Sequence, residues 1–158
     1  MATMEMGSAL PELFLLDQHG GRFSLQRYLG APLVVYFYPK DDTPGCTREA
    51  QDFSTHLAEF AALGAAVLGV SKDPPAKHAK FAAKYGLGVA LASDDDANLV
   101  LDAFGVWGEK RLYGRTCMGI ERATFLFNSA GRLARAWRKV KVPGHVAEVL
   151  AAAAVALG

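Results

Sequence analysis

Short apolar runs alternate with amphipathic stretches along most of this 158-residue chain. Residues 32–39 (PLVVYFYP) and 64–71 (GAAVLGVS) are nearly continuous apolar runs, which are typical of strands buried on both faces. Residues 89–96 predict a shorter strand that ends in a turn. Two segments that alternate around a glycine-containing turn, 10–25 and 122–140, predict hairpins.

Between the predicted strands, apolar residues recur at helical spacing. One helix is expected over about 44–63. The apolar positions that define it are Ala50, Phe53, Leu57, Phe60 and Leu63. A second helix is expected from Asp73, a candidate N-cap, to Gly86. A short helix is expected within 96–106 and a last one over about 145–156. Strands that alternate with helices, together with two hairpins, predict an α/β or α+β sandwich with a mixed sheet.

Size and composition fit one globular domain over residues 1–158. The net charge of +1 creates no strong field for nucleic acid or an acidic membrane. No apolar run approaches the ~18 residues of a membrane span. The first residues also lack the basic and apolar regions of a secretory signal. We therefore expect a cytoplasmic protein with reduced thiols.

The two cysteines, Cys46 and Cys117, have no C-x-x-C spacing, which argues against a zinc ribbon or a dithiol redox motif. Cys46 follows Thr43-Pro44, a strong helix-start signal, because Thr can cap a helix and Pro suits its first position. Cys46 is then about the third helical residue, where unpaired backbone N–H groups and the helix dipole favour a thiolate. The Thr43 hydroxyl can lie beside the sulfur. We prefer this interpretation over an inert packing cysteine.

A thiolate at a helix start can attack an acyl group, a disulfide or a peroxide. Acyl transfer requires a histidine base. His56 lies ten residues after Cys46 on the same predicted helix, ~15 Å away and too far to act. We expect His19, His78 and His145 on the solvated surface. The pattern favours a nucleophile that is activated by fixed positive charge and attacks a small, electron-poor substrate.

Two segments resemble a known family. Residues 39–46 (PKDDTPGC) resemble the P-x-x-x-T-x-x-C signature of peroxiredoxins. Residues 34–54 and 113–150 resemble its bacterioferritin comigratory protein, or peroxiredoxin Q, subgroup, and the similarity extends over about 8–157. The resemblance implies an α/β, thioredoxin-like sandwich with a mixed central sheet, flanking helices and an N-terminal hairpin. It also implies thiol-dependent reduction of hydrogen peroxide and organic hydroperoxides.

The resemblance assigns roles by position. Cys46 would be the peroxidatic cysteine, Thr43 would hold the peroxide and orient the sulfur, and Pro39 would shield the pocket. Arg122 would be the second-site cation, because a guanidinium stays charged and can donate to both a thiolate and a peroxide oxygen. Glu49 is expected either to orient this arginine or to be an ordinary surface charge. The sequence offers no ligand cluster or nucleotide loop, so we expect no metal, haem or flavin.

The chain departs from the subgroup at Gln51, where many members carry a resolving cysteine five residues after the peroxidatic one. Cys117 is the remaining internal candidate. An extended chain between it and Arg122 allows up to ~17 Å, whereas a disulfide needs Cα atoms within about 7 Å. Bridging to Cys46 would therefore require the helix start to unwind or the segment 108–119 to move.

We expect a 1-Cys mechanism, in which an external thiol from glutathione, glutaredoxin or thioredoxin resolves the Cys46 sulfenic acid. Two alternatives stay open: a peroxide-sensing redox relay protein that uses the same Cys46, and an atypical 2-Cys enzyme in which Cys117 resolves. The resemblance favours a monomer without nucleic-acid or membrane partners.

Overall fold

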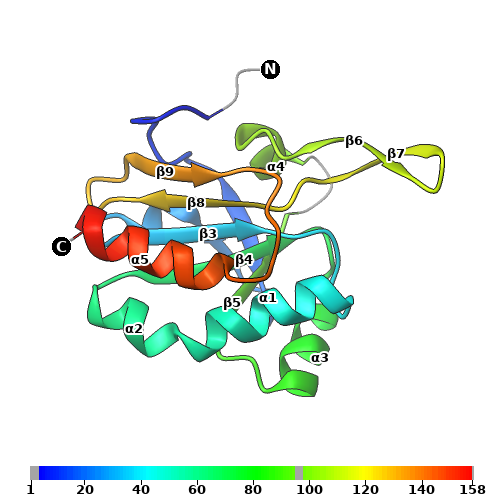
Figure 1. Cartoon of the computed structure of the whole chain (residues 1–158), viewed down its shortest axis with the longest axis horizontal. Helices are drawn as coiled ribbons and strands as arrows, with labels where there is room; N and C mark the ends of the chain where they lie inside the picture. Colours follow the sequence, from blue (N-terminus) through cyan, green and yellow to red (C-terminus); the bar gives the residue numbers. More distant parts are fainter. Residues whose placement is uncertain (1–3, 95–97, 158) are drawn as a thin grey trace.

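The computed structural model describes residues 4–94 and 98–157, which form a seven-stranded mixed sheet with helices on both faces (Figure 1). The strand order is β2-β1-β5-β4-β3-β8-β9. The strands are β1 (Phe14–Asp17), β2 (Arg22–Ser24), β3 (Leu33–Phe37), β4 (Ala66–Ser71), β5 (Ala90–Ser93), β8 (Ala123–Phe127) and β9 (Leu133–Trp137). β3, β4 and β5 are parallel, and the other neighbours are antiparallel. The predicted α/β class with a mixed sheet is confirmed.

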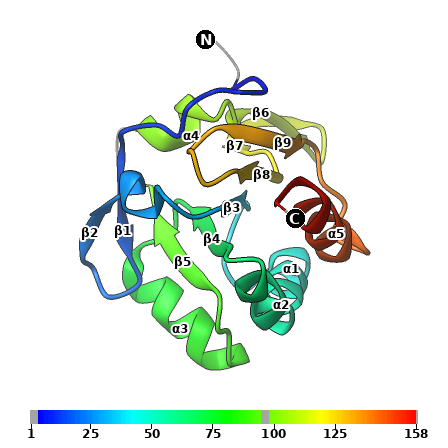
Figure 2. The same ribbon diagram turned by 90° about the vertical axis from the view of Figure 1, so that its left-hand side faces the viewer.

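Helices cover the two faces of the sheet unequally (Figure 2). They are α1 (Pro44–Thr55), α2 (Leu57–Ala62), α3 (Pro75–Tyr85), α4 (Leu99–Ala103), α5 (His145–Leu157) and the 3₁₀ turn η1 (Leu25–Tyr28). α1, α2, α3 and α5 contribute to the core on one face, whereas α4 and η1 contribute to the core on the other. None of the helices in the described ranges is long and apolar enough to cross a bilayer.

The central strand β3 is apolar throughout because it faces both cores. Leu33, Val35 and Phe37 pack into one core, and Val34 and Tyr36 pack into the other. All five side chains are at most 1% exposed. This two-sided burial explains the continuous apolar run and confirms the predicted buried strand.

The helix predicted over 44–63 is in fact two helices, α1 and α2, which meet at His56. His56 leaves helical geometry at φ −99° and ψ 8°. Apolar periodicity could not reveal the break, because Phe53 before it and Phe60 after it pack into the same core.

Of the two predicted boundaries of α3, the N-terminal one is wrong and the C-terminal one is confirmed. Pro74, not Asp73, occupies the N-cap position. The Asp73 carboxylate instead accepts hydrogen bonds from the Asp41 backbone N–H (2.8 Å) and the Ser71 hydroxyl (2.7 Å). Gly86 ends the helix in the left-handed conformation, with φ 61°.

Both predicted hairpins are present, as β1–β2 and β8–β9. A third one, β6 (Trp107–Leu112) with β7 (Arg115–Ile120), was not predicted and forms a separate two-stranded sheet that projects from the molecule (Figure 1). Its turn residues Tyr113 and Gly114 both have positive φ, as a two-residue hairpin turn requires, but Tyr-Gly is not a strong turn signal.

The remaining predicted elements are present. β5 and α4 correspond to the predicted short strand and short helix, and the last helix extends over His145–Leu157. Residues 95–96 of the turn predicted after β5, and 96–97 of the predicted short-helix segment, lie outside the described residues.

Candidate active site

The candidate site lies where the chain leaves the carboxyl end of β3 and enters α1. Thr43 occupies the N-cap position in extended conformation, and Pro44 begins the helix, as predicted. Cys46 is 1% exposed and packs into the core beneath α1. The predicted side-chain cap is wrong, because the Thr43 hydroxyl donates to the Lys40 carbonyl at 2.8 Å instead of accepting from the helix.

Sheet pairing brings Arg122 to this site from 76 residues away in the sequence. Phe37, the last residue of β3, pairs with Ala123, the first residue of β8. Arg122 immediately precedes that pair and therefore lies beside the loop that follows β3. Its Nη2 donates to the Cys46 sulfur at 3.4 Å, and its Nη1 donates to Glu49 Oε1 at 2.7 Å.

Gly45 leaves room for Arg122 to approach the sulfur closely. A Cβ atom at this position would lie 3.1 Å from Arg122 Nη2, so a side chain here would press on the guanidinium. No local sequence pattern reveals this close contact, because Arg122 is distant from Gly45 in the sequence.

Glu49 is fully buried and paired with Arg122, so it is not an ordinary surface charge. Burial raises its pKa to about 7, although the charge of Arg122 opposes the shift. Burial likewise disfavours the charge of Arg122, but Glu49 and Cys46 together raise the pKa of the guanidinium above its ordinary value. The pair therefore keeps a positive charge next to the sulfur.

Two buried oxygens beside this pair have no hydrogen-bond partner within the part of the chain that the structure describes: the Tyr36 hydroxyl and Glu49 Oε2. Burial, followed by the charges of Glu49 and Cys46, raises the pKa of Tyr36 well above its usual value. Tyr36 therefore stays neutral. It stacks on Phe53 with ring centroids 4.4 Å apart and forms part of the apolar surroundings of the thiol.

A second cation, Lys110 on β6, was not singled out from the sequence. Its Nζ donates to the Ile120 carbonyl at 2.5 Å. Burial and the charge of Arg122 lower the pKa of Lys110, whereas Cys46 and Cys117 oppose this shift. Lys110 is also the cross-strand partner of Cys117, and its ammonium lies within electrostatic reach of both sulfurs.

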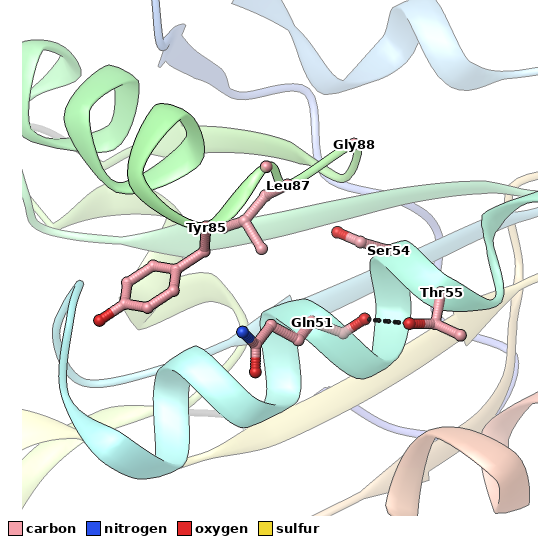
Figure 3. A pocket seen from close by; sticks show the side chains of 7 residues that line it. Gln51, Ser54, Thr55, Tyr85, Leu87 and Gly88 are labelled. Carbon is pink, nitrogen blue, oxygen red and sulfur yellow. Dashed lines mark hydrogen bonds between the residues drawn. The ribbon is translucent and has the colours of Figure 1, made fainter.

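Gln51 and Cys117 are both exposed, whereas the Cys46 sulfur is buried. Gln51 is exposed and faces a cleft of about 610 Å³ between α1 and the end of α3, together with Ser54, Thr55 and Tyr85 (Figure 3). Cys117 is exposed on β7, outside the main sheet. Both cysteines are free thiols. Pro39, the first residue of the quoted signature, is half-buried in the loop between β3 and α1.

The prediction that three histidines lie on the surface is wrong for two of them. His19 is exposed, but His78 is fully buried and His145 is 5% exposed. Each buried ring is held by distant partners: His145 bonds Thr124 at 2.8 Å, and His78 bonds Asp41 at 2.6 Å. Such partners are not visible in local sequence. Among the described residues, Arg122 is the hydrogen-bond partner of the Cys46 sulfur, and no histidine bonds it.

Comparison with known proteins shows the family of this chain. The model of the AhpC/TSA family matches residues 6–136. The chain is 49% identical to peroxiredoxin Bcp of Bacillus subtilis over 148 residues, covering 94% of each chain. It is 48% identical to peroxiredoxin Bcp of Xanthomonas campestris over 151 residues, covering 96% of this chain and 94% of the relative.

Solved structures also match this chain over nearly its whole length. A structure of the Xanthomonas campestris bacterioferritin comigratory protein superposes with a TM-score of 0.89 at 44% identity, covering all of both chains. A cysteine-to-serine mutant of PrxQ from Xylella fastidiosa superposes with a TM-score of 0.91 at 39% identity, covering 98% of each chain. The thioredoxin-like peroxiredoxin fold implied by the two sequence segments is thereby confirmed.

Proposed function

Because this chain belongs to the AhpC/TSA family and is a thiol-dependent peroxidase of the peroxiredoxin Q group, we propose that Cys46 is its peroxidatic thiol. The observation that carries the proposal is the hydrogen bond from Arg122 Nη2 to the Cys46 sulfur, 3.4 Å long, at the N-terminus of α1. A fixed guanidinium and the positive end of a helix both stabilise a thiolate over a thiol.

In the first step, the Cys46 thiolate attacks one oxygen of the peroxide. An S–O bond forms, the O–O bond breaks, and the sulfur loses two electrons to become a sulfenic acid. The leaving oxygen carries the developing negative charge and departs as water or an alcohol after it takes a proton. We infer that Arg122 stabilises this charge, because its Nη2 donates to the sulfur while its Nη1 is held by Glu49.

Thr43 and Pro39 would form the entrance to the sulfur. The Thr43 hydroxyl uses its hydrogen on the Lys40 carbonyl, so its lone pairs remain free to accept a hydrogen bond from the peroxide O–H. The half-buried Pro39 lies in the same loop and offers no N–H that would compete for the peroxide or the sulfur. Hydrogen peroxide and organic hydroperoxides both carry the O–H and O–O groups that these contacts require.

For the second step we favour a 1-Cys mechanism. An external thiol attacks the Cys46 sulfenic acid, an S–S bond forms and water leaves; a second thiol then releases Cys46. The support is that Gln51 occupies the fifth position after Cys46 and that Cys117 is exposed on the separate β6–β7 hairpin. Because Cys46 is 1% exposed, the first turn of α1 would have to open before a bulky thiol could reach it.

Separate replacement of the two cysteines tests this proposal. Peroxide consumption would be measured with thioredoxin, glutaredoxin or glutathione as the reductant. Cys46→Ser should abolish turnover, because serine cannot form a sulfenic acid. Cys117→Ser, the matched control, should keep most of it. Loss of turnover in Cys117→Ser would support the 2-Cys alternative, and a single stoichiometric oxidation without turnover would support the sensor.

Glutathione, glutaredoxin and thioredoxin are the reductants that we propose as partners. Two expectations from the sequence, a cytoplasmic location and a monomeric state, stay predictions.

A further inference from the structure

A buried polar network lies directly behind the loop 38–43 that leads into α1. At its centre, the Asp41 carboxylate accepts from the Tyr38 hydroxyl at 2.6 Å through one oxygen and contacts His78 Nδ1 at 2.6 Å through the other. The other ring nitrogen of His78 bonds the Ala92 carbonyl at 3.0 Å. All three side chains at the centre are at most 2% exposed. Both ring nitrogens of His78 therefore have a hydrogen-bond partner within the network.

The backbone of Asp41 is hydrogen-bonded as well as its side chain. The Asp41 N–H donates to Asp73 Oδ2 at 2.8 Å, and the same oxygen accepts from the Ser71 hydroxyl at the end of β4. Lys77 on α3 pairs with the other Asp73 oxygen at 3.0 Å. Asp41 is therefore tied through Asp73 to the end of β4 and through His78 to α3.

The carboxylates of Asp41 and Asp73 and the ring of His78 lie close enough to hold a metal ion. However, their oxygens and ring nitrogens already form the internal hydrogen bonds described above. A network that satisfies itself in this way fits a structural anchor better than a ligand set.

Asp42, the residue after Asp41, adds exposed contacts between the loop and α3. Asp42 has φ 62°, a left-handed conformation that a non-glycine residue seldom adopts. Its two carboxylate oxygens accept from Tyr85 (2.5 Å) and Lys84 (2.8 Å) at the end of α3. Consecutive residues of the loop are thus fixed on one helix, and the residue that follows them is Thr43.

We propose that the Asp41–His78 pair is a positioning element for the peroxidase reaction, which holds the loop 38–43 so that Thr43 and the Cys46 sulfur meet the peroxide in a fixed geometry. The inference rests on the proposed function of Cys46. Reaction at a 1% exposed sulfur depends on small displacements of the groups that line its entrance. An anchor made of buried polar groups that hydrogen-bond one another resists such displacement, because separating them leaves buried polar atoms without partners.

Two substitutions of one residue separate the two bonds of His78. In His78→Asn the shorter amide can replace Nδ1 and keep the bond to Asp41, whereas in His78→Gln the longer amide can replace Nε2 and keep the bond to Ala92. Both would be made in a Cys117→Ser background, so that Cys46 is the one thiol in the chain. For each protein, the rate constant of Cys46 with hydrogen peroxide and the rate constant of its alkylation by iodoacetamide would be measured.

We expect His78→Gln to lower the peroxide rate constant on the order of 10- to 100-fold, while alkylation is unchanged or faster, because alkylation does not need Thr43. His78→Asn should stay close to the parent. A purely structural role would instead lower the peroxide rate constant only in proportion to the folded fraction seen by circular dichroism, so a much larger loss in a folded variant marks positioning. If His78→Gln does not fold, Asp41→Asn tests the same bond and should show the same divergence.

An unchanged peroxide rate constant in folded His78→Gln or Asp41→Asn would overturn the positioning role. A parent protein whose Cys46 does not react with peroxide would instead overturn the proposed function. The two failures are therefore distinguishable.

Discussion

At the scale of single residues, the site is a chain of three charged or chargeable groups: Cys46, Arg122 and Glu49. Arg122 bridges the other two, with 3.4 Å to the sulfur and 2.7 Å to the carboxylate. A bridging guanidinium cannot be replaced by a lysine without losing one contact, because an ammonium has no second planar donor at that spacing. Glu49 thus holds the arginine in place from a fully buried position.

Glu49 also predicts a pH dependence of stability. Its pKa is about 7 in the folded chain because of burial, compared with an ordinary 4.5. Between these values the folded state keeps a proton that the unfolded state has lost, so this carboxyl stabilises the fold below pH 4.5 and that stabilisation is lost as the pH rises through 7. A shift of this size corresponds to about 3 kcal/mol.

Glu49→Gln should remove this dependence, because an amide does not titrate. The measurement is the free energy of unfolding in urea at several pH values, compared with wild type at each pH. The comparison is needed because burial lowers the pKa of His145 to about 4, so its titration overlaps in the opposite direction. Glu12→Gln, at an exposed position, is the control. Parallel curves for Glu49→Gln and wild type would contradict the prediction.

Sequence patterns identified some of these residues better than others. The Thr43-Pro44 signal placed Cys46 at a helix start without further information, because that signal is local. Arg122 came from the resemblance, since its approach depends on the pairing of β3 with β8. The burial of His78 depends on Asp41, 37 residues away in the sequence. No local pattern contains such a partner.

At the scale of elements, the start of α1 shows how helix stability and site geometry conflict. The first turn contains Gly45, a poor helix former, and lacks a side-chain cap from Thr43. Both features weaken the turn that carries Cys46. A side chain here would nevertheless crowd the guanidinium, because its Cβ would lie 3.1 Å from Arg122 Nη2.

Gly45→Ala should therefore separate stability from reactivity. Better helix propensity favours the variant by up to about 1 kcal/mol, whereas the displaced guanidinium should lower the rate constant of Cys46 with peroxide by about tenfold or more. Urea unfolding and rapid-mixing kinetics measure the two effects. Gly108→Ala, where an added Cβ meets nothing within 4 Å, should leave the rate unchanged. An unchanged rate in Gly45→Ala would show that Arg122 does not need this space.

Most helices and strands could be predicted from the sequence, because each is buried either along one face or completely. One-sided burial gives apolar residues at regular spacing, and complete burial gives a continuous apolar run. The exceptions have physical causes. The break at His56 leaves the apolar spacing intact, so α1 and α2 look like one helix. The β6–β7 hairpin is mostly exposed on β7, so alternation of apolar and polar residues is weak there. Its turn is formed by Tyr113 and Gly114, which are not a typical pair for such a turn.

At the scale of the whole molecule, the fold gathers the site from three parts of the chain. β3 and α1 supply the loop and Cys46, the edge of β8 supplies Arg122, and α3 anchors the loop from behind through His78. The β6–β7 hairpin carries Cys117 outside this assembly. One sulfur is therefore buried beside Arg122, while the other is exposed.

Mass spectrometry of the oxidised wild-type protein tests most directly whether Cys46 is a peroxidatic thiol without an internal partner. The reduced protein would receive one equivalent of hydrogen peroxide in the presence of dimedone, which traps sulfenic acids, and would be digested without reduction. We predict a dimedone adduct on the Cys46 peptide and an unmodified Cys117 peptide. A disulfide between the Cys46 and Cys117 peptides, or an adduct on Cys117 with Cys46 unmodified, would contradict the 1-Cys assignment.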